Sequence, residues 1–77
     1  MRQFGIRLHS FADIREFVTL AIAQPFDVLI GSGSNLVNAK SIMSMFCLDY
    51  SHPLHVRVTC DEEAFTRFTT AAAKFIP

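Results

Sequence analysis

Residues 54–60, Leu-His-Val-Arg-Val-Thr-Cys, carry the clearest secondary-structure signal in the chain. The even-numbered positions are apolar and the odd-numbered positions are polar, which predicts a strand with one face in the core. Asp61 follows as a helix cap, and Glu62 and Glu63 occupy the first turn, where the helix dipole favours negative charge. A half-buried strand that runs directly into a helix predicts a sheet with helices packed on one face.

The helix after Asp61 is expected to run almost to Pro77. Large apolar side chains recur in it at helical spacing and mark a single face. These residues are Phe65, Phe68, Ala72 and Phe75. We interpret them as core residues, because this helix has no other apolar face to bury.

The N-terminal half predicts one further strand and helix. Residues 4–8 alternate between apolar and other residues, as in a half-buried strand. Ser10 precedes Asp13 by three residues, a spacing that resembles a capping box. Apolar residues then recur at helical spacing until Pro25, whose ring cannot continue the helix.

The middle of the chain predicts a hairpin followed by a short helix. Residues 26–30 alternate, residues 31–35 have turn chemistry, and residues 36–38 form a short returning strand. A helix over residues 41–48 is expected to turn apolar side chains toward the sheet, namely Ile42, Met45, Phe46 and Leu48. The predicted order is βαββαβα, an α+β fold with a small, mainly antiparallel four-stranded sheet covered by helices on one face.

Composition limits the function classes. The 77 residues suffice for one domain, 1–77, and 51% of them are hydrophobic, which argues against disorder. The formal net charge of zero argues against a protein that grips nucleic acid or an anionic membrane. No apolar run approaches the roughly 18 residues of a membrane helix, and no signal peptide is recognisable. We therefore expect a cytoplasmic protein without membrane insertion.

The two cysteines, Cys47 and Cys60, are expected to be reduced, partly buried thiols. With His52 and His55 they form a C-x4-H-x2-H-x4-C array, but its spacings are not those of zinc sites. His55 and Cys60 also differ in parity along one strand, so they are expected to point to opposite faces. The sequence predicts neither a metal nor a cofactor.

Residues 37–43, Val-Asn-Ala-Lys-Ser-Ile-Met, followed by Leu48, resemble the segment that carries the regulatory serine of HPr. HPr is the histidine-containing phosphocarrier of the bacterial sugar phosphotransferase system, and its fold is an open-faced sandwich with the element order predicted above. The resemblance implies that Ser41 is a regulatory phosphoserine. It also implies a partner-binding surface at Lys40, Ile42 and Met43. Local chemistry alone favours the interpretation of Ser41 as a helix N-cap, and with the resemblance both interpretations stay open.

The histidine segment departs from the family pattern. HPr proteins carry a Gly-Leu-His-Ala-Arg-Pro-like signature, whereas residues 7–13 read Arg-Leu-His-Ser-Phe-Ala-Asp. An ungapped alignment anchored on residues 40–41 places Ser10 at the histidine position and Ala12 at the arginine position. A shift by one residue makes His9 the candidate phosphohistidine and leaves Phe11 where the arginine belongs. Asp13 then adds an unfavourable negative charge close to an incoming phosphate.

Two functions follow from this resemblance. The first is a regulatory or protein-interaction module, with Ser41 as its modification site. The alternative is an active phosphocarrier that passes a phosphoryl group from enzyme I to sugar-transport components through His9. The implied partners are enzyme I, sugar-specific transport components, and HPr kinase or a transcriptional regulator. No nucleophile, base and orienting group can be assembled from the spacing, so the sequence predicts no enzyme.

Overall fold

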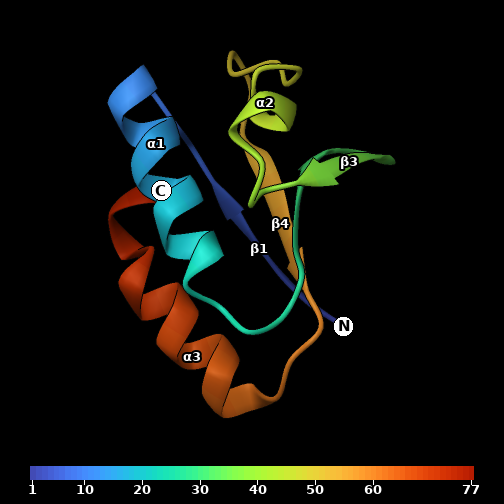
Figure 1. Cartoon of the computed structure of the whole chain (residues 1–77), viewed down its shortest axis with the longest axis vertical. Coiled ribbons are helices and arrows are strands. Elements are labelled where there is room, and N and C mark those ends of the chain that lie inside the picture. Colours follow the sequence, from blue (N-terminus) through green and yellow to red (C-terminus); the bar gives the residue numbers. More distant parts are fainter.

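The computed structural model describes residues 1–77 and contains one four-stranded sheet with three helices (Figure 1). The elements along the chain are β1 (Arg2–Ile6), α1 (Phe11–Ile22), β2 (Val28–Ser32), β3 (Asn35–Asn38), α2 (Ile42–Met45), β4 (Leu54–Val58) and α3 (Glu62–Ala71), followed by a 3₁₀ turn at Ala73–Phe75. The βαββαβα order and the open-faced α+β sandwich are therefore confirmed.

The strand that gives the strongest sequence signal, β4, lies inside the sheet. The strand order is β1-β4-β2-β3, and all three pairings are antiparallel. In the register of β4, Leu54 lies opposite Ile6 of β1, and Val56 lies between Phe4 of β1 and Ile30 of β2. No helix combines the length and hydropathy needed to cross a membrane.

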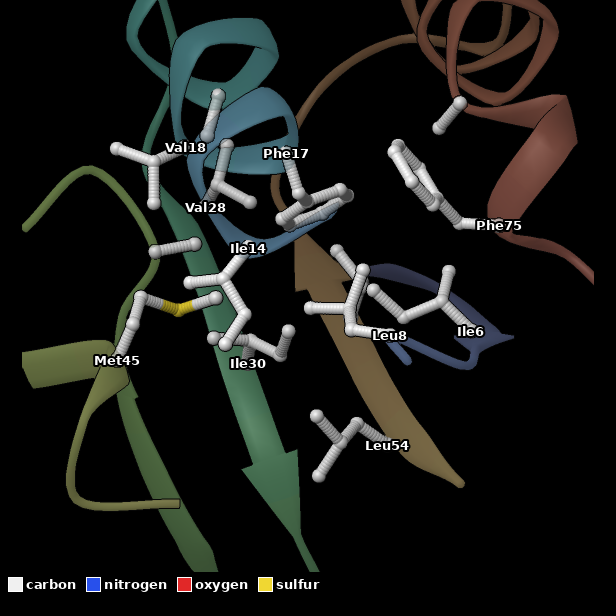
Figure 2. Packing of buried hydrophobic residues seen from close by; sticks show 14 of the residues in the cluster. Ile6, Leu8, Ile14, Phe17, Val18, Val28, Ile30, Met45, Leu54 and Phe75 are labelled. Atoms are coloured by element: carbon white, nitrogen blue, oxygen red, sulfur yellow. The ribbon is translucent and has the colours of Figure 1, made fainter. Parts of the chain in front are cut away.

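The alternation along the strands divides the sheet into two faces. Leu54, Val56 and Val58 are buried, whereas His55 is exposed on the open face. Helices α1 and α3 cover the buried face (Figure 1). Their side chains and those of the sheet form one cluster of 16 buried residues, and Met45 joins it from α2 (Figure 2).

Aromatic rings connect the two layers. The ring of Phe68 on α3 lies 5.7 Å from that of Phe4, 6.1 Å from that of Phe17 and 5.9 Å from that of Phe26. The Phe68 contacts with Phe4 and Phe26 are edge-on, an arrangement that aromatic pairs favour. Phe17 also contacts Phe75 edge-on at 6.0 Å, and Figure 2 shows this pair beside Ile6 and Leu8. Of the predicted apolar face of the last helix, Phe68, Ala72 and Phe75 are thus core residues, and Phe65 packs against the core while only partly buried.

Most element boundaries differ from those expected by a few residues: β2 is shifted from residues 26–30, β4 ends at Val58 and not at Cys60, and α3 ends at Ala71, beyond which only the 3₁₀ turn continues toward Pro77. β1 ends at Ile6 because its partner β4 begins opposite, at Leu54, and the Arg7 amide donates instead to the Phe75 carbonyl at 2.8 Å. The helix expected over residues 41–48 is limited to Ile42–Met45 and continues as single turns through Leu48. The expectation that Phe46 faces the sheet is wrong, because its side chain is 54% exposed.

The β2–β3 hairpin depends on two glycines. Gly33 has a φ of +60°, which glycine adopts without the strain of a side chain. A Cβ on Gly31 would lie 1.9 Å from the Asn35 carbonyl oxygen, so the two strands approach too closely there for any side chain. This hairpin leads the chain to Ser41, the cap of α2.

Candidate functional site

The first turn of α1 and the short helix α2 meet at one end of the molecule (Figure 1). Phe11 of α1 and Phe46, just after α2, stack with ring centroids 5.8 Å apart and planes inclined by 10°. Both side chains are more than half exposed. The structure thus brings the histidine segment and the serine segment, about 30 residues apart in sequence, to a single surface.

Ser10 caps α1, as the sequence predicts. Its Oγ accepts a hydrogen bond from the Asp13 amide at 3.1 Å. The Asp13 carboxylate does not bond back to Ser10 itself, as in a capping box, but accepts from the amide of His9 at 3.0 Å. The backbone on both sides of the cap is therefore held by residues 10 and 13, and the His9 side chain projects from an ordered segment.

A shallow hollow of about 320 Å³ lies beside this cap. Its lining residues come from α1, from the segment before it and from the connector between α2 and β4: Leu8, His9, Ser10, Phe11, Ile14 and Tyr50. The Tyr50 hydroxyl donates to the Met45 carbonyl and so attaches the connector to α2. Burial raises the pKa of Tyr50 above its ordinary value of 10.0, and the neighbouring Cys47 adds to that shift.

Replacement of Tyr50 by phenylalanine is expected to cost about 1 kcal/mol of folding free energy at neutral pH, because one hydrogen bond is lost. Since the pKa of Tyr50 is raised in the folded chain, its contribution is complete below pH 10 and declines as the pH rises through the folded-state pKa. Urea unfolding at neutral and alkaline pH checks both effects. Parallel losses of stability in the wild type and Tyr50→Phe at alkaline pH would contradict this assignment.

The serine segment lies on the same surface. Ser41 is half-buried, and its Oγ accepts from the Ser44 amide at 3.3 Å, so it serves as the N-cap of α2. Lys40 is also half-buried, and its Nζ donates to the Gln24 carbonyl at 2.8 Å. Ile42 packs partly against the core, whereas Met43 is 74% exposed. Of the expected partner-binding residues, Met43 is therefore the most accessible.

Phe11, Met43 and Phe46 together are called the apolar face below. Met43 and Phe46 are three residues apart, so they share one side of α2 and its following turn. The exposed fractions are 55% for Phe11, 74% for Met43 and 54% for Phe46. The sequence pattern did not identify Phe11 or Phe46 as part of a surface, because their helical spacing is equally that of core residues.

No cation has the position that the family signature gives to its arginine: Ala12 occupies it when Ser10 is aligned with the histidine, and Phe11 occupies it when His9 is. The nearest arginines in the sequence are Arg7 and Arg15. The Arg15 guanidinium lies 6.0 Å from the centroid of the Phe11 ring, a distance suited to a cation–π contact. Arg15 thus extends along the apolar face.

The cysteines remain unpaired. Cys60 is half-buried, as expected, but Cys47 is exposed, so the expected partial burial of Cys47 is wrong. Its position follows from the early end of α2: the turn at 46–48 directs residues 46 and 47 outward and keeps Leu48 partly buried against the core.

Comparison with known proteins gives matches among solved structures alone. No family model matches the sequence, and no curated protein matches it significantly. A crystal structure of HPr from Thermoanaerobacter tengcongensis superimposes with a TM-score of 0.72 and 25% identity, over 91% of this chain and 89% of the other. The chain has an HPr-like fold. The HPr structure from Mycoplasma, with a TM-score of 0.64 and 14% identity over 96% and 98% of the two chains, agrees in fold.

These likenesses extend over nearly the whole chain and support an HPr-like family. In this HPr-like chain the candidate residues fall into two groups. His9 and Ser10 lie at the start of α1, and Ser41 and Met43 lie at the start of α2. The stacked rings of Phe11 and Phe46 connect the two groups.

Proposed function

We propose that this HPr-like chain is a regulatory or protein-interaction module of the bacterial sugar phosphotransferase system, and that it is not an efficient carrier. The Thermoanaerobacter tengcongensis structure, 25% identical to this chain, is that of an HPr, which supports the link to phosphotransfer proteins. The altered histidine segment supports the non-carrier role, because in either alignment an uncharged residue, Phe11 or Ala12, stands where the family has the cation that holds a phosphoryl group.

The observation that carries the proposal is the exposure of the apolar face beside Ser41. Aromatic and methionine side chains are enriched in protein–protein interfaces, and a stacked, ordered ring pair loses little conformational freedom on docking. Phe11, Met43 and Phe46 provide such side chains on adjoining helices. The partners of this surface are proteins, by resemblance enzyme I, sugar-specific transport components, HPr kinase or a transcriptional regulator.

Ser41 is the proposed phosphorylation site on that surface. A phosphoryl group there would add about two negative charges next to the exposed Met43, and so would change which partners the apolar face accepts. The Ser41 hydroxyl is bonded to the Ser44 amide alone and is half-buried, so a modest opening of the first turn of α2 exposes it.

Incubation with HPr kinase and ATP is expected to add one phosphate, which intact-mass measurement detects. Ser41→Ala should abolish the addition, whereas Ser44→Ala, one helical turn further, should retain it, because the Ser44 side chain is not the proposed acceptor. A chain that gains no phosphate, or a Ser41→Ala variant that gains as much as the wild type, would overturn the assignment of Ser41.

The alternative function is a phosphocarrier that uses His9. One structural observation favours it: His9 is exposed at the start of α1 and borders the hollow beside the cap. A neutral imidazole in such a position is a competent nucleophile. This alternative requires an acid-labile phosphate on His9 after incubation with enzyme I and phosphoenolpyruvate.

A further inference from the structure

The Asp13 carboxylate is hydrogen-bonded to the backbone amide of His9. Its negative charge therefore lies next to the residue that would receive a phosphoryl group. Asp13 Oδ2 accepts from the His9 amide at 3.0 Å, and the Asp13 amide in turn donates to Ser10 Oγ at 3.1 Å. The first bond holds the carboxylate against the His9 amide, and the second fixes the backbone of Asp13 at the helix cap. The Asp13 carboxylate contacts the backbone of His9 and forms no ion pair with its ring, so its effect on the imidazole is that of a nearby charge acting through space.

We propose that Asp13 guards His9 against phosphorylation. Its carboxylate neutralises part of the positive potential of the first helical turn, which otherwise attracts anions, and it repels an approaching phosphoryl donor. Neither nearby arginine pairs with this charge: the Arg15 guanidinium lies against the Phe11 ring, and Arg7 makes no ion pair with Asp13. Asp13 is therefore a selectivity residue, because its negative charge lowers the reactivity of His9 toward phosphoryl donors.

This inference rests on the proposed function, because it gives a physical cause for the proposed non-carrier role. It concerns the reactivity of His9 and not the docking of a partner. A small phosphoryl donor therefore separates it from the Ser41 proposal. With phosphoramidate, an imidazole nitrogen forms a bond to phosphorus, the bond from phosphorus to the amine nitrogen breaks, and ammonia departs with the ring proton.

The chain contains its own reference imidazole. His55 is exposed on the open face of the sheet, and its cross-strand neighbours are Gly5 and Gly31, which carry no side chains. His52 is less suitable as a reference, because its Nε2 lies 3.9 Å from the carboxylate of Asp49. The ratio of phosphate on His9 to phosphate on His55, measured by peptide mapping at early times, thus reports on His9 alone.

Asp13→Asn removes the charge and retains an oxygen that accepts from the His9 amide. At low ionic strength this variant is expected to raise the ratio of His9 to His55 labelling about three- to tenfold over the wild type. In 1 M salt, where the screening length is about 3 Å, the gain should largely disappear. Ser10→Ala is the matched control, since it removes the other half of the cap and keeps the carboxylate.

Three results would overturn the guard role of Asp13: an unchanged ratio in Asp13→Asn, a gain of equal size in Ser10→Ala, which would indicate fraying of the helix, or no label on His9 in any variant. Any of these outcomes leaves phosphorylation of Ser41 by the kinase unaffected. Conversely, absence of kinase-dependent phosphate on Ser41 would not change the ratio of His9 to His55 labelling. The two proposals can therefore fail separately.

Discussion

Replacement of Phe68 by alanine is expected to destabilise the chain by about 3–5 kcal/mol, the usual cost of removing a buried aromatic side chain. Phe68 is 1% exposed, and its ring contacts those of Phe4, Phe17 and Phe26. It thus connects α3 with α1, with β1 and with the segment before β2. Domains of this size have a total stability near the low end of about 5–15 kcal/mol, so a large unfolded population is expected.

Urea unfolding followed by far-ultraviolet circular dichroism measures this effect. Phe46→Ala is the matched control, because it removes the same side chain from an exposed stacked pair and is expected to cost about 1 kcal/mol. Equal losses of stability in Phe68→Ala and Phe46→Ala would show that the aromatic contacts of α3 do not hold the two layers together.

The fold is largely predictable because its main signals are local. The two-residue alternation over residues 54–60 gives both the strand and its buried face, and the caps at Ser10 and Asp61 form the predicted hydrogen bonds to the amides of Asp13 and Ala64. The order of the strands in the sheet is not predictable in this way. The position of β4 between β1 and β2 depends on pairings between distant segments, which no local pattern encodes.

The site is less predictable for the same reason. The roles of Phe11 and Phe46 arise from a contact between two helices, and each residue alone has the spacing of a core residue. The early end of α2 decides that Phe46 and Cys47 are exposed, and helix ends are poorly determined by apolar spacing. Lys40 carries an expected surface charge, but its bond to the Gln24 carbonyl depends on how α1 ends nearby.

The second large effect concerns phosphotransfer. With enzyme I and phosphoenolpyruvate, this chain is expected to remain essentially unlabelled under conditions that label an ordinary HPr to completion. The physical reasons are the absence of the family arginine, since Phe11 occupies its position relative to His9 and Ala12 its position relative to Ser10, and the carboxylate of Asp13 on the His9 amide. A missing cation and an added anion both raise the free energy of a phosphoryl group at His9.

The measurement that tests the non-carrier role most directly is intact mass of this chain and an ordinary HPr incubated in the same tube with enzyme I and phosphoenolpyruvate. We predict acid-labile phosphate on the ordinary HPr and none on this chain. Acid-labile phosphate on this chain at a comparable rate, lost in His9→Ala and retained in Ser10→Ala, would contradict the account and establish the phosphocarrier alternative.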